Sequence, residues 1–523
     1  MPKLQTDYLI ELIRTLTKAE KRHFRLLVKR NQANEELLFL QLFDLLDKHK
    51  RYDEALILRK IPAIKKRQLS NLKAHLYKQL LLSLRLLYRP HNMDIEIRER
   101  LDYARVLYNK GLYRQSLEIL DKAKVTARNV RLNALTLEIL DFEKLIEGQY
   151  ITRSIDTRAE TLAEESKEEI TRVSRTHEFS NLSLQLYGLY LKMGLVRSRE
   201  EKDFVHVFFQ KNLPKYDLDE LGFYEKLYLY KAYDWYSLMN QDFPLYYKYA
   251  QRWVDLFDEY PEMVKLQTPL FLKGLHNLLN SLFMVGRYDK FVEVLERLES
   301  FDVKNTDKPT NNIEGLFFLF KYIHRINLHF IAGTFSEGVN ILPKLDQLLS
   351  DNPYNWDDHR ILVFRYKIAC MYFGSGDNER AIDYLNEIIN RRQPDFREDT
   401  QCFARILNLI AHFELGNETL VTYQVKSVYR FLIKIEDLHE VQNEILKFLR
   451  KLPKIYEYEL KDEFTKLRDT LIKLEKHPYE KRPFVYLDII SWLESKIEGR
   501  TVQEVIREKF LKRQGIKTIN VTD

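Results

Sequence analysis

The side chains that carry most enzyme chemistry are present in this chain, but they do not form a known catalytic pattern. The sequence has no His-Glu-x-x-His motif, no phosphate-binding glycine loop, no Gly-x-Ser-x-Gly elbow and no paired-cysteine metal site. His324 and His329 are five residues apart, a poor spacing for two ligands on one helix face. Asp357-Asp358-His359 is typical of a helix start, and Gly374-Ser375-Gly376 lies at a predicted turn between helices. We therefore expect no enzymatic activity, no metal and no cofactor.

Positive charge gathers at the N-terminus. The chain has 523 residues and a formal net charge of +7, yet residues 1–100 carry 22 Lys or Arg against 12 Asp or Glu. Thr17-Lys18-Ala19-Glu20 predicts a capping box at the start of a helix that runs to about Arg30. Phe24 and Leu27, with His23 and Leu26, should point to one side of this helix, and Phe24 and Leu27 should be buried.

The other side of the same helix is a predicted basic face. It consists of Lys18, Arg22, Arg25 and Lys29. Two interpretations stay open: a surface for nucleic-acid phosphates or an acidic protein, and an ordinary solvated face. Aromatic residues do not interleave with the basic ones, which favours the solvated face.

Composition indicates a helical protein without a membrane span. Hydrophobic residues make up 45% of the chain, while glycine (15) and proline (14) are scarce, which leaves long uninterrupted segments. No run of 18 apolar residues and no signal peptide is visible. The two cysteines, Cys370 and Cys402, lie in apolar helical patterns, as buried thiols of a reducing compartment do. We expect a cytoplasmic protein with no membrane insertion.

A turn pattern recurs along the chain. A glycine ends one helical segment, an aromatic residue lies three positions before it, and small or apolar residues follow at five, nine and twelve positions after it. The turn glycines are Gly111, Gly286, Gly333, Gly376 and Gly416. Together with a glycine-free turn at 241, the later turns are 45, 47, 43 and 40 residues apart. Regular spacing of this kind is the signature of a helical repeat protein.

Two of these units carry a family resemblance. Ala104…Gly111-Leu112-Tyr113…Ser116…Leu120…Ala123 and Ala369…Tyr372…Gly376-Asp377…Ala381…Leu385 resemble the tetratricopeptide-repeat (TPR) family. The spacing is longer than that family's usual unit, and its closing proline is absent. The resemblance implies an all-α chain built as an α-solenoid of antiparallel helix pairs. We expect a basic helical N-terminal segment (1–93), a repeat array (94–436) and C-terminal capping helices (437–523).

The same resemblance implies a groove for peptide on the concave face, lined by the first helix of each pair. The position six residues before each turn would face it, with lysine and histidine nearby. The candidate groove residues are Arg105, Lys231, Trp235, Lys273, His276, Asn280 and Asn327. At such positions, Asn and Lys resemble the family's clamp for peptide backbone and carboxylate; ordinary packing or solvated residues are the other interpretation.

The segment 223–260 supports a binding function, because it holds fourteen aromatic residues. Most are expected in the core, and some in the groove, where Tyr and Trp are common anchors. The leading hypothesis is a scaffold that binds a protein or peptide. The alternative is a regulator whose basic N-terminal helices contact nucleic acid while the solenoid senses a peptide or dimerises.

Overall fold

The computed structural model describes residues 2–31, 34–49, 53–89, 92–149, 157–303, 310–391, 398–434, 440–452, 455–477, 479–480, 484 and 488–515. Within these ranges the chain is helical throughout, with no β-strand, so the expected all-α class is confirmed for them. No helix in the same ranges is long and apolar enough to cross a membrane.

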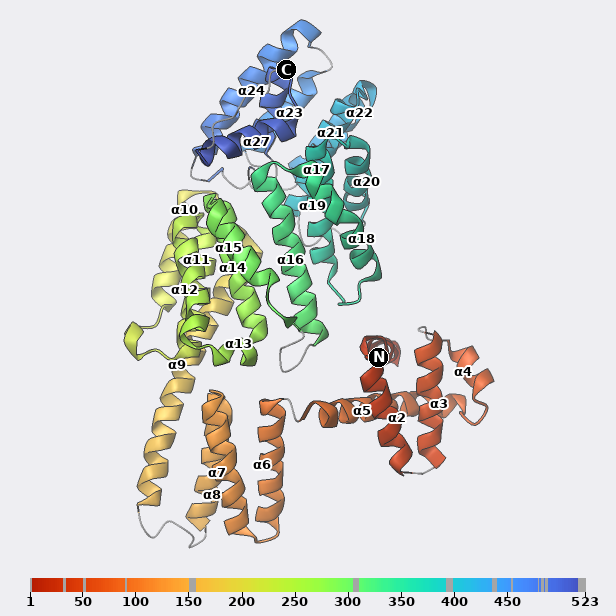
Figure 1. Ribbon diagram of the computed structural model, residues 1–523, viewed down its shortest axis with the longest axis vertical. Helices are drawn as coiled ribbons and strands as arrows, with labels where there is room; N and C mark the ends of the chain where they lie inside the picture. Colours follow the sequence, from red (N-terminus) through yellow and green to blue (C-terminus); the bar gives the residue numbers. More distant parts are fainter. Residues whose placement is uncertain are drawn as a thin grey trace. The chain divides into compact units, whose positions relative to one another are not determined.

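The chain divides into two compact units, residues 1–175 and 176–523 (Figure 1). The expected boundaries near residues 93 and 436 stay predictions. The helices of unit 1 are α1 (Pro2–Thr15), α2 (Lys18–Asn31), α3 (Asn34–His49), α4 (Glu54–Lys60), α5 (Lys66–Tyr88), α6 (Met93–Asn109), α7 (Tyr113–Asn129), α8 (Asn133–Gln149) and the first half of α9 (Arg158–Met193).

The N-terminal helices of unit 1 pack around an apolar cluster. Phe24 of α2 meets Phe43 of α3 edge-on, with ring centroids 4.8 Å apart. The predicted capping box is present, because the Thr17 amide donates to the Glu20 carboxylate and the Glu20 amide donates back to the Thr17 hydroxyl. The predicted apolar side was partly wrong: Leu26 is 54% exposed and Leu27 is half-buried.

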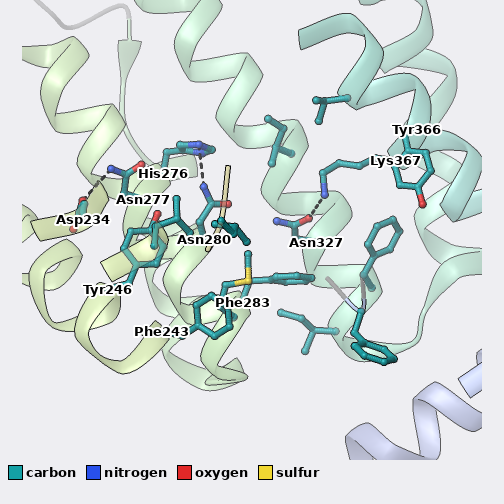
Figure 2. Close-up of a pocket in the computed structure, with 18 of the residues that line it drawn as sticks. Asp234, Phe243, Tyr246, His276, Asn277, Asn280, Phe283, Asn327, Tyr366 and Lys367 are labelled. Carbon is teal, nitrogen blue, oxygen red and sulfur yellow. Dashed lines mark hydrogen bonds between the residues drawn. The ribbon is translucent and has the colours of Figure 1, made fainter. Parts of the chain in front are cut away.

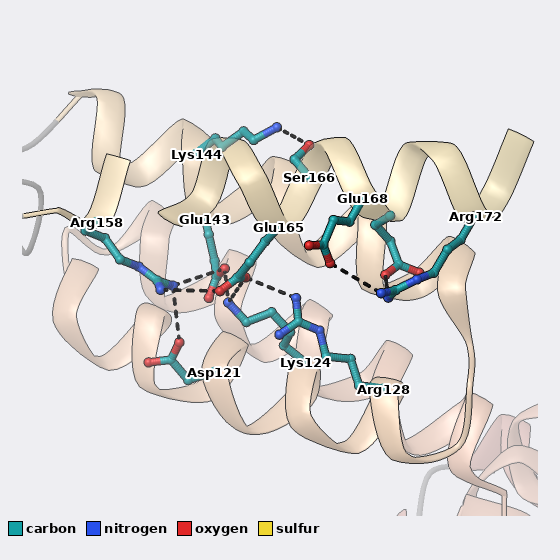
Figure 3. A network of polar contacts seen from close by, with 11 residues as sticks. Asp121, Lys124, Arg128, Glu143, Lys144, Arg158, Glu165, Ser166, Glu168 and Arg172 are labelled. Atoms are coloured by element: carbon teal, nitrogen blue, oxygen red, sulfur yellow. Dashed lines mark hydrogen bonds and ion pairs between the residues drawn. The ribbon is translucent and has the colours of Figure 1, made fainter. Parts of the chain in front are cut away.

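Helices α7, α8 and α9 of unit 1 share a buried network of charges (Figure 3). The Lys124 ammonium lies 2.6 Å from the Glu143 carboxylate and 3.2 Å from that of Glu165. The Arg158 guanidinium reaches Glu143 at 3.4 Å, and Arg128 reaches Glu165 at 3.1 Å. The side chains of Lys124 and Glu143 are only 6% and 0% exposed, so each charge relies on its partners instead of water.

Unit 2 continues with helix pairs and ends in a group of C-terminal helices. Its elements are the second half of α9, α10 (Arg199–Asn212), η2 (Leu218–Glu220), α11 (Phe223–Met239), α12 (Phe243–Glu259), α13 (Glu262–Leu266), α14 (Thr268–Val285), α15 (Tyr288–Glu299), α16 (Asn311–Ala332), α17 (Phe335–Gly338), η4 (Val339–Ile341), α18 (Leu342–Asp351), α19 (Asp358–Ser375), α20 (Asn378–Ile389), α21 (Glu398–Glu414), α22 (Glu418–Lys434), α23 (Glu440–Lys451), η6 (Glu457–Glu459), α24 (Leu460–Glu475), α26 (Ile489–Glu498) and α27 (Val502–Arg513).

The recurring turn has one backbone geometry. Each turn glycine is left-handed, as at Gly376 with φ +89°, and the next amide donates to the carbonyl four residues before the glycine, as from Asp377 to Tyr372 at 2.9 Å. Gln241 (φ +56°) takes the glycine position in the predicted glycine-free turn. Arg131 (φ +57°) does so between α7 and α8, a turn that the glycine pattern missed.

After each turn the second helix packs closely on the first. The residues five positions after Gly111, Gly333 and Gly376 were predicted to be buried, and all three are: Ser116, Gly338 and Ala381. A Cβ at Gly338 would lie 2.5 Å from the Met371 sulfur, so the small residue permits this approach. Helix α12 then contacts α14, α14 contacts α16, and α20 contacts α21, which joins neighbouring pairs into one core.

Candidate functional site

A cavity of about 1950 Å³ lies within unit 2 (Figure 2). Its walls come from the second half of α9, from α11, α12, α14, α16 and α19, and from the C-terminal helices α24, α26 and α27. Most of the array's lining residues lie on helices that precede a turn; Tyr288 of α15 and Phe335 of α17, which follow turns, line it as well. The cavity is therefore lined mainly by helices that occupy equivalent places in successive pairs.

The helical period explains which residues face this space. The residues six positions before the turns at 241, 286, 333 and 376 all line the cavity, and they are Trp235, Asn280, Asn327 and Cys370. Lys231, Lys273 and His276 line it as well. The structure thus brings six of the seven candidate groove residues to one cavity.

The seventh candidate, Arg105, lies elsewhere. It is in α6 of unit 1, where its guanidinium is 2.7 Å from the Glu138 carboxylate and 3.8 Å from that of Asp102. Arg105 lies six residues before Gly111, as the other candidates lie before their turns, but it belongs to unit 1 and not to unit 2.

Asparagine and histidine side chains form a polar row across the cavity wall. The Asn277 amide donates to Asp234 at 3.1 Å. The Asn280 amide lies 3.0 Å from Nε2 of His276, whose Nδ1 lies 2.9 Å from Nε2 of His324 (Figure 2 shows the first of these two contacts). With the Asn280 amide donating, His276 is protonated on Nδ1 and donates to His324. Burial lowers the pKa of both histidines well below the usual value, so both are neutral at pH 7.

Three lysines line the cavity without a carboxylate partner. Among the described residues, no ion pair within 4.0 Å joins Lys231, Lys273 or Lys367 to an Asp or Glu, although the Asp234 carboxylate acts at longer range on Lys231 and Lys273. Lys231 lies 4.9 Å from the centre of the Tyr228 ring and Lys273 lies 5.7 Å from that of Phe320. These cation–π contacts compensate only part of the lost hydration.

Lys367 has a different neutral partner, since its ammonium donates to the Asn327 side-chain oxygen at 2.6 Å. Burial lowers the pKa of Lys367 to about 8. The pKa of Lys273 is also lowered to about 8, first by burial and then by the nearby Arg360 guanidinium. The Asp234 carboxylate acts in the opposite direction on the pKa of Lys273, but it does not offset the effect of burial.

Aromatic residues form a further wall. The Trp235 ring packs against Tyr187 and Tyr190 of α9, with centroids 4.9 and 5.1 Å apart. Leu184 and Leu191 lie beside them on α9 and are 67% and 64% exposed. The cavity therefore combines apolar surface, neutral hydrogen-bonding groups and unpaired cations.

Sequence reasoning missed several residues of this site. Asn277 and Lys367 lie three residues before predicted groove positions, one helical turn earlier on the same face. Extending the predicted position by one turn would have found them. Asp234 has no such signal, and the α9 tyrosines belong to a helix outside the recognised repeats.

The predicted basic face is divided by its contacts in unit 1. Lys18, Arg22 and Lys29 are exposed. Arg25 is half-buried and lies 2.8 Å from the Asp44 carboxylate and 3.3 Å from that of Asp47. Three of the four cations therefore remain open to solvent, and the fourth joins α2 to α3.

The cavity holds one cysteine, Cys370. Burial raises the pKa of the Cys370 thiol to about 12, so this group is a neutral thiol at pH 7. Within the described ranges, no three or more His, Cys, Asp or Glu side chains are placed to hold a metal ion.

Comparison of the chain with protein-family models, with curated proteins and with solved structures finds no match.

Proposed function

We propose that this chain is a non-enzymatic, TPR-like helical-hairpin solenoid, and that the unit 2 cavity binds an extended peptide or protein segment. The observation that carries the proposal is the set of equivalent positions on α11, α14, α16 and α19 that line one cavity. Stacked repeats present such positions as a row along an extended ligand.

The polar groups match the needs of a peptide. An extended segment carries unpaired backbone N–H and C=O groups, which require partners when they leave water. Asn277, Asn280 and Asn327 each offer a donor and an acceptor. Lys231, Lys273 and Lys367 favour a segment with acidic side chains or a terminal carboxylate, which could approach these ammonium groups more closely than Asp234, the carboxylate of the cavity that acts on Lys231 and Lys273.

Trp235 provides a direct measurement of binding. It is half-buried on the cavity wall, whereas Trp253, Trp356 and Trp492 are buried. We would titrate the protein with three N-acetylated random hexapeptide mixtures that carry two fixed residues, both Glu, both Gln or both Lys, and record tryptophan fluorescence. The Glu mixture should bind most tightly and the Lys mixture least.

Two variants separate the roles of the polar groups. Lys273→Met with Lys367→Met should remove the preference for Glu over Gln, whereas Asn280→Leu with Asn327→Leu should weaken all mixtures. Lys290→Met is the matched control, because Lys290 lies on α15 outside the cavity and pairs with Glu293 at 2.6 Å. Absence of any fluorescence response to the three mixtures would show that the cavity does not bind peptides.

A further inference from the structure

One turn glycine differs from the others in what packs against it. A Cβ at Gly286, Gly376 or Gly416 would meet nothing within 4 Å. At Gly333 a Cβ would lie 2.5 Å from the backbone nitrogen of Arg507 in α27. The α16–α17 turn is thus also the place where the last described helix of the chain approaches the array, and only glycine permits that distance.

Helix α27 also packs on α16 and α19, and Ile506 joins the core of unit 2. The Arg507 guanidinium donates to the Ala332 carbonyl at 3.0 Å, and the Ser336 amide donates to the Gln503 side chain at 2.7 Å. The Phe510 ring meets Tyr288 edge-on, with centroids 4.6 Å apart. These contacts join α27 to the turn ends of helices and leave its outer face in water.

The geometry of α27 allows it to move as one piece. A left-handed glycine, Gly499 (φ +66°), separates it from α26. The Lys509 ammonium also donates to the Ser491 hydroxyl at 2.9 Å and pairs with Glu494, both on α26, so undocking must break these contacts or carry α26 along. It begins with its own capping box, in which Thr501 and Glu504 satisfy each other's amides, so its first turn does not depend on docking. In the docked position Val502, Ile506 and Phe510 form part of the cavity wall.

We propose that α27 is a gate on the cavity, docked through Gly333, and that exchange of ligand requires it to undock. The identity of the ligand that enters past α27 rests on the proposed peptide-binding function. The undocking of α27 does not depend on that proposal. A segment bound between α27 and the array would contact both and would favour the docked state, because a ligand shifts an equilibrium toward the state that it binds better.

Cys370 reports opening without any ligand. It lines the cavity on α19, a helix that contacts α27, where it is half-buried. Its pKa near 12 keeps the thiol protonated, so labelling in the docked state should be slow. Cys402, the only other cysteine, is buried in the α21 core and reports global unfolding. We would measure the rate of maleimide labelling at each cysteine by peptide mass spectrometry on the full chain at pH 8.

Gly333→Ala is the test variant, and Gly416→Ala is its matched control. Both substitutions place alanine at a left-handed position, with φ of +62° and +72°, but only the first pushes on α27. Gly333→Ala should raise the rate of Cys370 labelling roughly 5- to 30-fold, because losing one modest packing interaction shifts the docking equilibrium of α27 by about that factor. Gly416→Ala should leave the rate unchanged. Arg507→Ala should act in the same direction as Gly333→Ala.

Two results would overturn the gate. If Gly333→Ala and Arg507→Ala leave Cys370 labelling at the parent rate, α27 is a fixed wall. If Cys402 labelling rises in parallel with that of Cys370, the variants unfold unit 2 instead of opening it. A failed peptide titration with a positive labelling result would reject the proposed function and keep the gate.

Discussion

Both units hold lysine side chains partly or fully away from water, and they compensate the charges in different ways. Lys124 in unit 1 lies within 3.2 Å of two carboxylates. Lys273 and Lys367 in unit 2 have aromatic rings or an amide as neighbours, and burial lowers the pKa of each to about 8. The first arrangement holds three helices together. The second leaves positive charge in a cavity, where an incoming anion would stabilise it.

Removing the unit 1 lysine should have the largest effect. Lys124→Met leaves the Glu143 carboxylate buried with only the Arg158 contact at 3.4 Å. We expect a loss of about 3–5 kcal/mol in the free energy of unfolding, measured by urea titration with circular dichroism. Lys122→Met, at an exposed position of the same helix, should change stability by less than about 0.5 kcal/mol. A double variant Lys124→Met/Glu143→Leu that is no more stable than the single variant would contradict the pairing argument.

Creating an unpaired buried charge in unit 2 should be nearly as damaging. Ala381 is 0% exposed where α20 packs on α19, so Ala381→Glu would bury a carboxylate with no partner. We expect a loss of about 3 kcal/mol or more, read from the thermal unfolding transition. Arg380→Glu, one residue away and exposed, is the control. Parent-like melting of Ala381→Glu would mean that the repeat packing is wrong at this position.

Removing an unpaired cavity lysine should stabilise the free protein. Lys273→Met replaces a desolvated cation by an apolar side chain of similar length. We expect the free energy of unfolding to rise by roughly 1 kcal/mol at pH 7, with weaker binding of the Glu hexapeptide mixture. Loss of stability in this variant would assign Lys273 the structural role that Lys124 has.

The two lysines should also give binding and stability opposite pH dependences. Both lose their charge as the pH rises through about 8, so binding of the Glu mixture should weaken from about pH 7 to pH 9. Unfolded lysines titrate near 10.5, so between about pH 8 and 10.5 the unfolded chain binds more protons than the folded chain. Stability without ligand should therefore rise with pH across that window. In the double variant Lys273→Met/Lys367→Met, neither the binding of the Glu mixture nor the stability should change with pH in these ways.

The basic face should give the smallest effect on the fold. Changing Lys18, Arg22 and Lys29 to Glu alters exposed positions, and each change should move stability by less than about 0.5 kcal/mol. Adding Arg25→Glu should cost up to about 1 kcal/mol more, because it breaks the contacts with Asp44 and Asp47. We expect peptide binding to persist in these variants. Salt-dependent DNA or RNA binding by the parent, lost in the variants, would instead favour the nucleic-acid alternative.

Sequence alone determined the local features of this protein. The capping box at Thr17 and Glu20, the turns at glycine and the burial of Ser116, Gly338 and Ala381 follow from spacing within a few residues. The face of each first helix was predictable as well, since a helix repeats every 3.6 residues. The exposed Leu26 and the glycine-free turn at Arg131 are two places where the local pattern failed.

Tertiary structure decided which lysines are paired and what encloses the cavity. Lys124 and Lys273 are both lysines within helices, and their sequence neighbours do not reveal how each charge is compensated. Glu143 and Glu165 lie beside the Lys124 ammonium, whereas the Phe320 ring lies near that of Lys273. The wall made by α27 depends on Gly333 and Arg507, which are far apart in the chain. Such contacts form between helices that are distant in the chain, so the spacing of residues within one helix cannot predict them.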